Sequence, residues 1–194
     1  MYELLKRLTD VVCSTVGLVV LSPVFLLIAL LLKIQNNGPV LFRQERIGLG
    51  GKPFTIYKFR TMSSVVEDEG PQLIARSDEA YSTPLECFLR SHHLDELPQL
   101  WNVLRGDMSL VGPRPERKYF IDKIMEHTDR YELIYRMRPG LTSEATLYNG
   151  YTDTMEKMLR RLEMDISYLE RRSLWLDFKI AMKTLVCMVS GKNF

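Results

Sequence analysis

The longest apolar stretch of the chain lies close to its N-terminus. Residues 11–32 carry no charged side chain, and a run of about 20 apolar residues is typical of a membrane helix. Ser22 and Pro23 interrupt the run near its centre, where a proline removes a backbone hydrogen bond and bends the helix. Each half is then about 16 Å long, roughly half the thickness of the hydrocarbon core. The pattern predicts two short helices joined at a break.

The charges that flank this run bear on how it meets a membrane. Lys6 and Arg7 precede the run, and Lys33 and Arg43 follow it, so the positive-inside rule marks neither end as the outer one. We therefore expect residues 1–36 to form a re-entrant membrane helix that enters one leaflet and returns. A kinked helix that crosses the whole bilayer is the alternative that the sequence leaves open. A signal peptide fits poorly, because its apolar core has only roughly 7–15 residues.

Shorter patterns in residues 37–194 predict a second, cytosolic domain. Segments 40–48 and 52–62 are rich in β-branched and aromatic residues and flank the glycines of residues 48–51. This arrangement predicts a β-hairpin with the glycines in its turn. A glycine loop that binds phosphate is less favoured, because no strand-to-helix context surrounds it. The polar residues 63–84 predict a loop.

Helical patterns dominate the remainder of the chain. We expect helices over residues 85–90, 97–104, 115–126, 127–137 and 155–169. The apolar segment 174–189 predicts a helix that either lies in the membrane interface or is buried in the core. The expected fold class is therefore α+β and mostly helical, with a re-entrant membrane helix, a small β-hairpin and a cytosolic helical domain that carries amphipathic interfacial helices.

Composition narrows the classes of function. The chain has 194 residues, of which 46% are hydrophobic and 26% charged, and its net charge is +2. These values exclude a disordered chain, and the mean hydropathy of −0.09 excludes a transporter with many membrane helices. The balanced charges give no basic field, so no nucleic-acid partner is expected. Cys13 and Cys187 lie in apolar runs, and we expect both to be buried as small hydrophobic side chains.

Two charged motifs are the first candidates for chemistry. Asp95 and Glu96 are adjacent, just ahead of a proline. On a helix their side chains would point about 100° apart, so that one could act as a nucleophile while the other held a metal ion. Capping of the following helix is the structural alternative, because helix N-termini favour acidic side chains. Arg114 lies between Pro113 and Pro115, on a stiff backbone that suits a fixed contact with phosphate.

Other residues complete a plausible site for phosphoryl transfer from a diphosphate. Such a reaction needs a nucleophile, a divalent metal ion and cations at the phosphate oxygens. The candidate phosphate contacts are Lys58, Arg60, Arg90 and Arg114. Residues 138–142, Arg-Pro-Gly-Leu-Thr, form a further candidate motif. His92 and His93 are weaker candidates for a zinc site, because no third histidine or cysteine is suitably spaced.

Several long motifs follow one another along nearly the whole chain. They are the Ser-Pro break in the apolar N-terminus, GPVLFRQERIG, KPFTIYKFRTM, LDELPQLWNVLRGDMSLVGPRPE, RPGLT and SLWLDFKI. In this order they resemble the bacterial sugar transferase family, the small monotopic phosphoglycosyl transferases. Because several long motifs occur together, the resemblance is far more specific than a single glycine pattern.

The resemblance implies roles for many of these residues. It implies that Asp95 attacks the β-phosphate of a nucleotide diphosphate sugar, usually UDP-linked, and that polyprenol phosphate then attacks the aspartyl sugar-phosphate. Glu96 matches the residue associated with Mg²⁺ (or Mn²⁺), and Arg114 matches the arginine of the Pro-Arg-Pro motif. Residues 37–194 would then be the catalytic domain, at the cytoplasmic face of the bacterial inner membrane, and residues 1–36 its membrane segment.

The implied partners are a nucleotide diphosphate sugar, polyprenol phosphate and the lipid bilayer, in the first membrane step of surface polysaccharide or glycoconjugate synthesis. Association with downstream glycosyltransferases or with a second copy of the chain stays open. We expect the minimal catalytic form, without additional spanning helices. Residues 76–90 and 143–150 depart from the usual family pattern, which leaves the identity of the sugar undetermined.

Two alternative functions belong to other classes. An inactive membrane-anchored scaffold is opposed by the intact Asp95, Glu96 and Arg114. A metal-dependent hydrolase of nucleotide sugars is opposed by the apolar N-terminus, because a soluble substrate needs no membrane site.

Overall fold

The computed structural model describes residues 1–35, 38–61, 83–150 and 152–190. In chain order its elements are α1 (Tyr2–Val20), α2 (Ser22–Gln35), β1 (Leu41–Ile47), η1 (Leu49–Gly51), β2 (Pro53–Phe59), α3 (Pro84–Ser91), η3 (Leu94–Glu96), α4 (Gln99–Arg105), β3 (Ser109–Val111), α5 (Lys118–Met125), η4 (Asp129–Arg136), β4 (Gly140–Thr142), α6 (Glu144–Asn149), α7 (Met155–Arg171) and α8 (Leu174–Ser190). The mostly helical α+β prediction is confirmed. Most of the loop expected over residues 63–84 falls outside the described residues.

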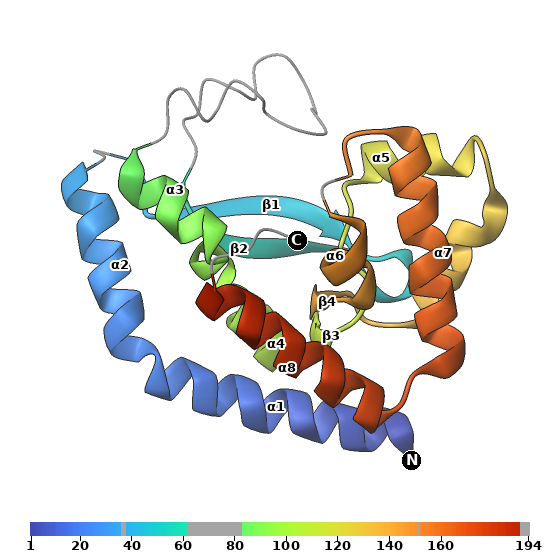
Figure 1. Ribbon diagram of the computed structural model, residues 1–194, viewed down its shortest axis with the longest axis horizontal. Coiled ribbons are helices and arrows are strands. Elements are labelled where there is room, and N and C mark those ends of the chain that lie inside the picture. Colours follow the sequence, from blue (N-terminus) through green and yellow to red (C-terminus); the bar gives the residue numbers. More distant parts are fainter. Residues whose placement is uncertain (36–37, 62–82, 151, 191–194) are drawn as a thin grey trace.

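The first two helices form a bent pair along the border of the molecule (Figure 1). They are bent by 58° at a break between Val20 and Ser22, and the Ser22 hydroxyl donates to the carbonyl of Val19 at 2.8 Å. The predicted break is thus confirmed. Within the described ranges, the lengths and compositions of the helices allow a membrane crossing only for this pair taken together, and for no helix alone.

One face of α1 is attached to the rest of the molecule by polar contacts. The buried Asp10 accepts hydrogen bonds from the Leu110 N–H at 2.9 Å and the Ser109 hydroxyl at 3.1 Å. Arg7 donates to two carbonyls in the last turn of α4, at 2.6 and 2.8 Å. These bonds hold α1 against α4 and β3.

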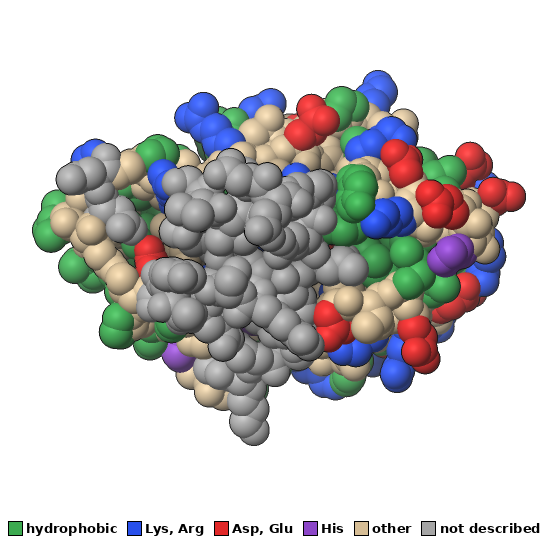
Figure 2. All heavy atoms as spheres, turned by 90° about the horizontal axis from the view of Figure 1, so that it is seen from above, with side chains coloured by type: hydrophobic (Ala, Val, Ile, Leu, Met, Phe, Trp, Pro, Cys, Tyr) green, Lys and Arg blue, Asp and Glu red, His purple; other side chains and the backbone are tan. Residues whose placement is uncertain are grey.

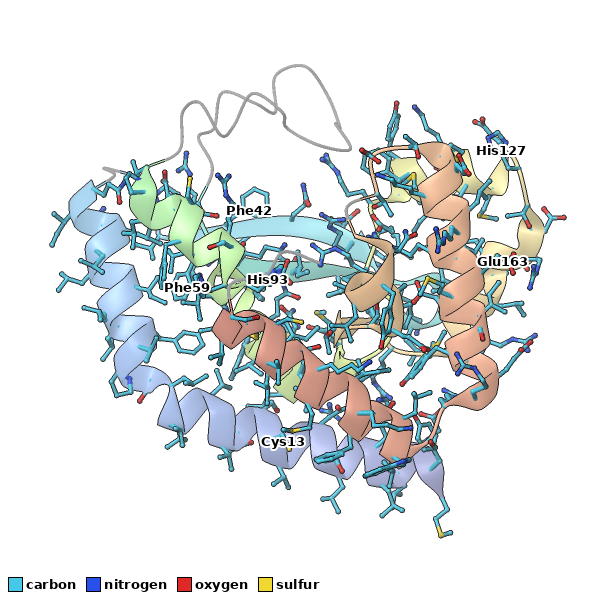
Figure 3. All side chains as sticks on the ribbon, in the orientation of Figure 1. Cys13, Phe42, Phe59, His93, His127 and Glu163 are labelled. Atoms are coloured by element: carbon cyan, nitrogen blue, oxygen red, sulfur yellow. The ribbon has the colours of Figure 1, made fainter. Side chains whose placement is uncertain are left out.

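Helices α1, α2 and α8 expose many apolar side chains. In α8 only Asp177 and Ile180 are buried. Its exposed apolar residues are Leu174, Trp175, Phe178, Met182, Leu185, Val186 and Val189. The alternative that this helix is buried in the core is therefore wrong. The expectation of a buried Cys13 is also wrong, because the residue lies on an exposed face of α1 (Figure 3), and Cys187 is only partly buried.

The predicted hairpin is confirmed, with β1 and β2 antiparallel and Leu41 opposite Phe59. Its turn contains Gly50 and Gly51 with φ of 68° and 72°, a conformation that favours glycine. The fully buried Asn102 of α4 then ties the hairpin down, because its amide bonds to backbone groups of β2 at 2.7 and 3.2 Å. The position of β2 relative to α4 is thereby fixed.

The C-terminal half packs around a second core. Strands β3 and β4 pair in parallel, and α5, η4, α7 and α8 contribute buried side chains to the same cluster. The expected α-helix over 127–137 is a 3₁₀ helix instead. Tyr131, Ile134 and Met137 are buried at a spacing of three residues, which matches the 3₁₀ period. Figure 2 shows acidic and basic side chains interspersed over the end that carries α5 and α7.

Candidate active site

The adjacent carboxylates lie on a tight turn between α3 and α4. His93, which precedes this turn, has φ of 53°, in the left-handed region, and the chain changes direction there at the foot of α3 (Figure 3). Asp95 and Glu96 then form the 3₁₀ turn η3 and are only 9% and 8% exposed. The expected α-helical placement is wrong, and the side chains are separated by the about 120° of a 3₁₀ turn.

The capping alternative for these carboxylates is also wrong. Helix α4 begins at Gln99, and its N-cap is Pro98, which makes no side-chain capping bond. A capping side chain would accept hydrogen bonds from N–H groups of the first turn. The hydrogen bonds that Glu96 accepts come instead from side chains of other segments. Glu96 is therefore held by tertiary contacts and not by capping.

Two predicted cations converge on one oxygen of Glu96. The Lys58 ammonium of β2 lies 2.6 Å from Glu96 Oε1, and the Arg114 guanidinium lies 3.0 Å from the same atom. Charge-assisted bonds of this kind are short and strong. Burial alone raises the pKa of Glu96, but the charges of Arg114 and Lys58 outweigh it and hold the pKa below its ordinary value. Glu96 is therefore ionised.

Asp95 has a different electrostatic environment. Burial raises its pKa, the positive charge of Lys58 opposes that rise, and the negative charge of Glu96 adds to it. Because a desolvated carboxylate is less stable than a hydrated one, its charge is available for reaction with an electrophile. The turn therefore combines one ionised, paired carboxylate with one that lacks equal compensation.

The segment that carries Arg114 is fixed from behind by β4. The Gly112 N–H donates to the Thr142 carbonyl at 3.0 Å, and the Gly140 N–H donates to the Pro113 carbonyl at 2.8 Å. The two backbones are so close that a Cβ atom on Gly140 would lie 2.1 Å from the Gly112 nitrogen. The motif of residues 138–142 thus supports the arginine segment. Pro113 and Pro115 are buried and serve as scaffold.

The other predicted phosphate contacts lie elsewhere in the described part of the chain. The Arg60 backbone N–H donates to Val40 at 2.8 Å, and its guanidinium borders Gly38. Arg90 lies on α3, with a guanidinium nitrogen 3.9 Å from the sulfur of Cys87. The structure brings Lys58 and Arg114 together on Glu96 but gives no such contact for these two arginines.

The donor set allows a test of the implied metal ion. Within the described ranges, no group of three or more His, Cys, Asp or Glu side chains is arranged to hold a metal. Mg²⁺ commonly takes only one or two carboxylates from the protein and completes its shell with water and substrate phosphates. Glu96 would therefore suit Mg²⁺ only if water and substrate oxygens completed its shell, and Asp95 and Glu96 do not form a metal cage of their own.

Sequence reasoning missed the roles of three residues near the site. Glu116 and Arg46 form ion pairs behind Arg114, and His93 supplies the left-handed turn. Glu116 directly follows the Pro-Arg-Pro motif, so its position was a usable signal. Arg46 carried no such signal, because an arginine on a strand is common. His93 was singled out only as a weak candidate for a zinc site, because a left-handed turn at a histidine has no strong sequence signal.

Comparison with known proteins assigns the family. The family described as bacterial sugar transferase matches residues 1–191. A UDP-glucose:undecaprenyl-phosphate glucose-1-phosphate transferase of Klebsiella pneumoniae is 42% identical over 182 residues, which cover 93% of this chain and 39% of the relative. The enzyme of the same name from Caulobacter vibrioides is 42% identical over 194 residues, covering 98% of this chain and 72% of the relative.

A third relative acts on another sugar. The UDP-N-acetylgalactosamine-undecaprenyl-phosphate N-acetylgalactosaminephosphotransferase of Aeromonas hydrophila is 37% identical over 190 residues, covering 98% of this chain and 45% of the relative. The chain spans about two fifths of the length of several of these relatives. The matched residues nevertheless include both carboxylates, both cations and the N-terminal helix pair. On this evidence the chain belongs to the bacterial sugar transferase family.

Proposed function

We propose that the chain transfers a sugar-1-phosphate from a UDP-sugar to a polyprenol phosphate. The observation that carries the proposal is the buried pair Asp95 and Glu96, with the two cations Lys58 and Arg114 at Glu96. The names of the relatives support the substrates, because they share a UDP-sugar donor and undecaprenyl phosphate as acceptor. They differ in the sugar, so the sugar is not part of the proposal.

The proposed reaction has two steps at one phosphorus atom. A carboxylate oxygen of Asp95 forms a bond to the β-phosphorus, the bond to the bridging oxygen breaks, and UMP leaves with the electron pair. A phosphate oxygen of the polyprenol phosphate then attacks the same phosphorus and displaces Asp95. The product is polyprenyl-diphospho-sugar, and the carboxylate is regenerated.

The neighbouring residues have electrostatic roles in this proposal. Lys58 and Arg114 lie where negative charge develops on the phosphate oxygens, and fixed cations of this kind stabilise the transition state. Glu96, with Asp95 beside it, would hold Mg²⁺, whose charge neutralises the diphosphate when bound. Burial excludes water, which favours transfer to the lipid over hydrolysis.

A panel of radiolabelled UDP-sugars with polyprenol phosphate tests the proposal. The expected result is a lipid-linked product with at least one sugar, and exchange of labelled UMP into UDP-sugar without lipid. Asp95→Asn keeps the size of the side chain but removes the attacking charge, so both activities should fall by about 10⁴-fold or more. Free sugar-phosphate as the sole product would favour a hydrolase, and inactivity with every donor would favour a scaffold.

We further propose that residues 1–36 form a re-entrant membrane segment and that residues 37–194 act at the cytoplasmic face of the bacterial inner membrane. Two observations support this topology. Arg7 and Asp10 bond to the domain, which keeps the start of α1 on the same side of the membrane as the domain. The exposed apolar side chains of α1, α2 and α8 offer a surface for lipid.

Cysteine labelling tests the topology. In a background with the three natural cysteines replaced by serine, Glu3→Cys and Lys33→Cys should both react with a membrane-impermeant maleimide in inverted vesicles. Neither should react in intact spheroplasts. If Glu3→Cys reacts in spheroplasts while Lys33→Cys does not, the pair spans the bilayer and the re-entrant topology is wrong.

A further inference from the structure

The segment that carries Arg114 is fixed at its far end by Glu116. One oxygen of the Glu116 carboxylate accepts from Arg161 of α7 at 3.0 Å, and the other lies 3.6 Å from Arg46 of β1. The backbone makes parallel contacts, because the Ile47 N–H donates to the Glu116 carbonyl at 3.1 Å and Arg46 donates to the Pro115 carbonyl at 3.2 Å. Glu116 therefore joins the hairpin to α7 directly behind the arginine.

These ion pairs are largely withdrawn from water. The side chains of Glu116, Arg161 and Arg46 are 13%, 10% and 17% exposed. The Nε–H groups of both arginines are buried and have no hydrogen-bond partner among the described residues. A buried ion pair with unsatisfied donors adds little stability compared with apolar packing. Stability alone is thus a weak reason for this arrangement.

The two ends of the arginine segment are held by different means. Before Arg114, the segment is fixed by backbone bonds to β4 through Gly112 and Pro113. After Arg114, it is fixed by the side-chain ion pairs of Glu116. Arg114 itself is the residue between the two clamps, and its guanidinium is one-third exposed, at 33%. An arginine held at both ends of its segment can present its guanidinium in one direction without further ordering.

Glu116 and Arg114 also interact through their charges. Arg114 donates to Glu96 and not to Glu116 in the contacts described here. The pKa of Arg114 is raised first by Glu96, against the effect of burial, and further by the negative charge of Glu116. The charge of Glu116 thus favours the charged guanidinium in addition to the direct contact with Glu96.

We infer that Glu116 is a positioning residue for the phosphate-binding arginine. By joining Arg46 of β1 to Arg161 of α7 it sets the direction in which Arg114 meets Glu96, and hence the diphosphate of the donor. This inference rests on the proposed function. It assigns Glu116 no contact with substrate, so its effect should depend entirely on Arg114.

Glu116→Gln is the direct test. The amide keeps the shape but loses the charge that holds two guanidinium groups, so kcat/KM for the UDP-sugar should fall by about 10- to 100-fold. Glu116→Asp keeps the carboxylate and should recover part of that loss. The matched control is Glu163→Gln, which removes a surface ion pair with Arg130 on the outer face of α7 (Figure 3) and should leave activity unchanged.

A double-mutant cycle separates positioning from a general effect on the fold. If Glu116 acts through Arg114, adding Glu116→Gln to Arg114→Gln should lower kcat/KM by less than about twofold beyond Arg114→Gln alone. Additive losses would overturn the inference, as would Glu116→Gln activity equal to that of the control. If Glu116→Gln does not fold, the cycle is repeated with Glu116→Asp or Arg46→Lys in its place, each combined with Arg114→Gln. The same criterion of less than additive losses then applies. Inactivity of the unmodified chain with every UDP-sugar would instead refute the proposed function.

Discussion

Two buried carboxylates in this molecule have similar surroundings and different bonding. Asp177 of α8 accepts hydrogen bonds on both oxygens: from Lys6 at 2.7 Å and Tyr2 at 3.0 Å on one, and from Tyr168 at 2.6 Å on the other. Glu96 accepts both of its described bonds on one oxygen. The two side chains are almost equally exposed, at 12% and 11%.

The difference in hydrogen bonding indicates different roles for Asp177 and Glu96. The bonds of Asp177 join α1 and α7 to the start of α8, and they use both carboxylate oxygens. The bonds of Glu96 hold two cations and leave its second oxygen with bonding capacity for a ligand. A carboxylate whose two oxygens both accept hydrogen bonds within the fold stabilises that fold, whereas one with an oxygen that accepts none can serve substrate or metal.

Of the changes that test this comparison, Glu96→Gln should have the largest effect on activity. The amide cannot hold Lys58 and Arg114 as firmly or bind a divalent ion as well, so we expect kcat/KM to fall by about 100-fold. The free energy of unfolding should fall by less than in Asp177→Ala, because the glutamine amide keeps the size of the side chain and its oxygen can still accept hydrogen bonds from Lys58 and Arg114. Steady-state kinetics and thermal unfolding of the same preparation check this. Retained activity with a large loss of stability would show that Glu96 has a structural role like that of Asp177.

Asp177→Ala should show the opposite effect. Removing one partner of a buried, hydrogen-bonded ion pair destabilises by about 3–5 kcal/mol, which for a chain of this size lowers Tm by about 10 °C or more. Glu3→Gln is the control, because its ion pair with Arg172 lies at the same helix junction but is exposed. The control should lose less than about 1 kcal/mol. Equal losses in the free energy of unfolding for Asp177→Ala and Glu3→Gln would show that burial of the Asp177 ion pair adds no stability to this helix junction.

Local features of the fold were predictable from the sequence, and the tertiary ones were not. The hairpin, the Ser-Pro break and most helices follow from periodicity, proline and glycine within short windows. The outward position of Cys13 and the left-handed turn at His93 do not. Which side chains of a helix are exposed depends on what the helix packs against. A residue other than glycine with positive φ has no strong sequence signal.

The sequence indicated which residues form the candidate site, but it did not indicate how they contact one another. Asp95, Glu96 and Arg114 stand out because charged residues occur there beside prolines. That Lys58 and Arg114 share one oxygen of Glu96 depends on how the hairpin and the arginine segment pack, far apart in sequence. The same reason explains why Arg60 and Arg90, which are chemically equivalent candidates, do not contact Glu96.

A third buried carboxylate extends the comparison to pH. Asp165 of α7 is 5% exposed, and burial raises its pKa to about 8, against the positive charge of Arg161 and with added effects of Glu116 and Glu144. The unfolded chain releases this proton near its ordinary value of 3.8, whereas the folded chain retains it to about pH 8. The proton contributes stability that is fully present below about pH 4 and is lost as pH rises to about 8.

Asp165→Asn should therefore flatten this part of the pH dependence, because the amide keeps the shape and has no charge to bury. We expect the variant to unfold at about the same temperature as the unmodified chain at pH 4. At pH 9 it should be more stable, by up to about 5 kcal/mol, since the unmodified chain must then bury a charge that its neighbours only partly compensate. Thermal unfolding from pH 4 to 9 measures this, with the exposed Asp122→Asn as control. Parallel curves for the variant and the unmodified chain would mean that Asp165 is as well compensated in the fold as Glu96.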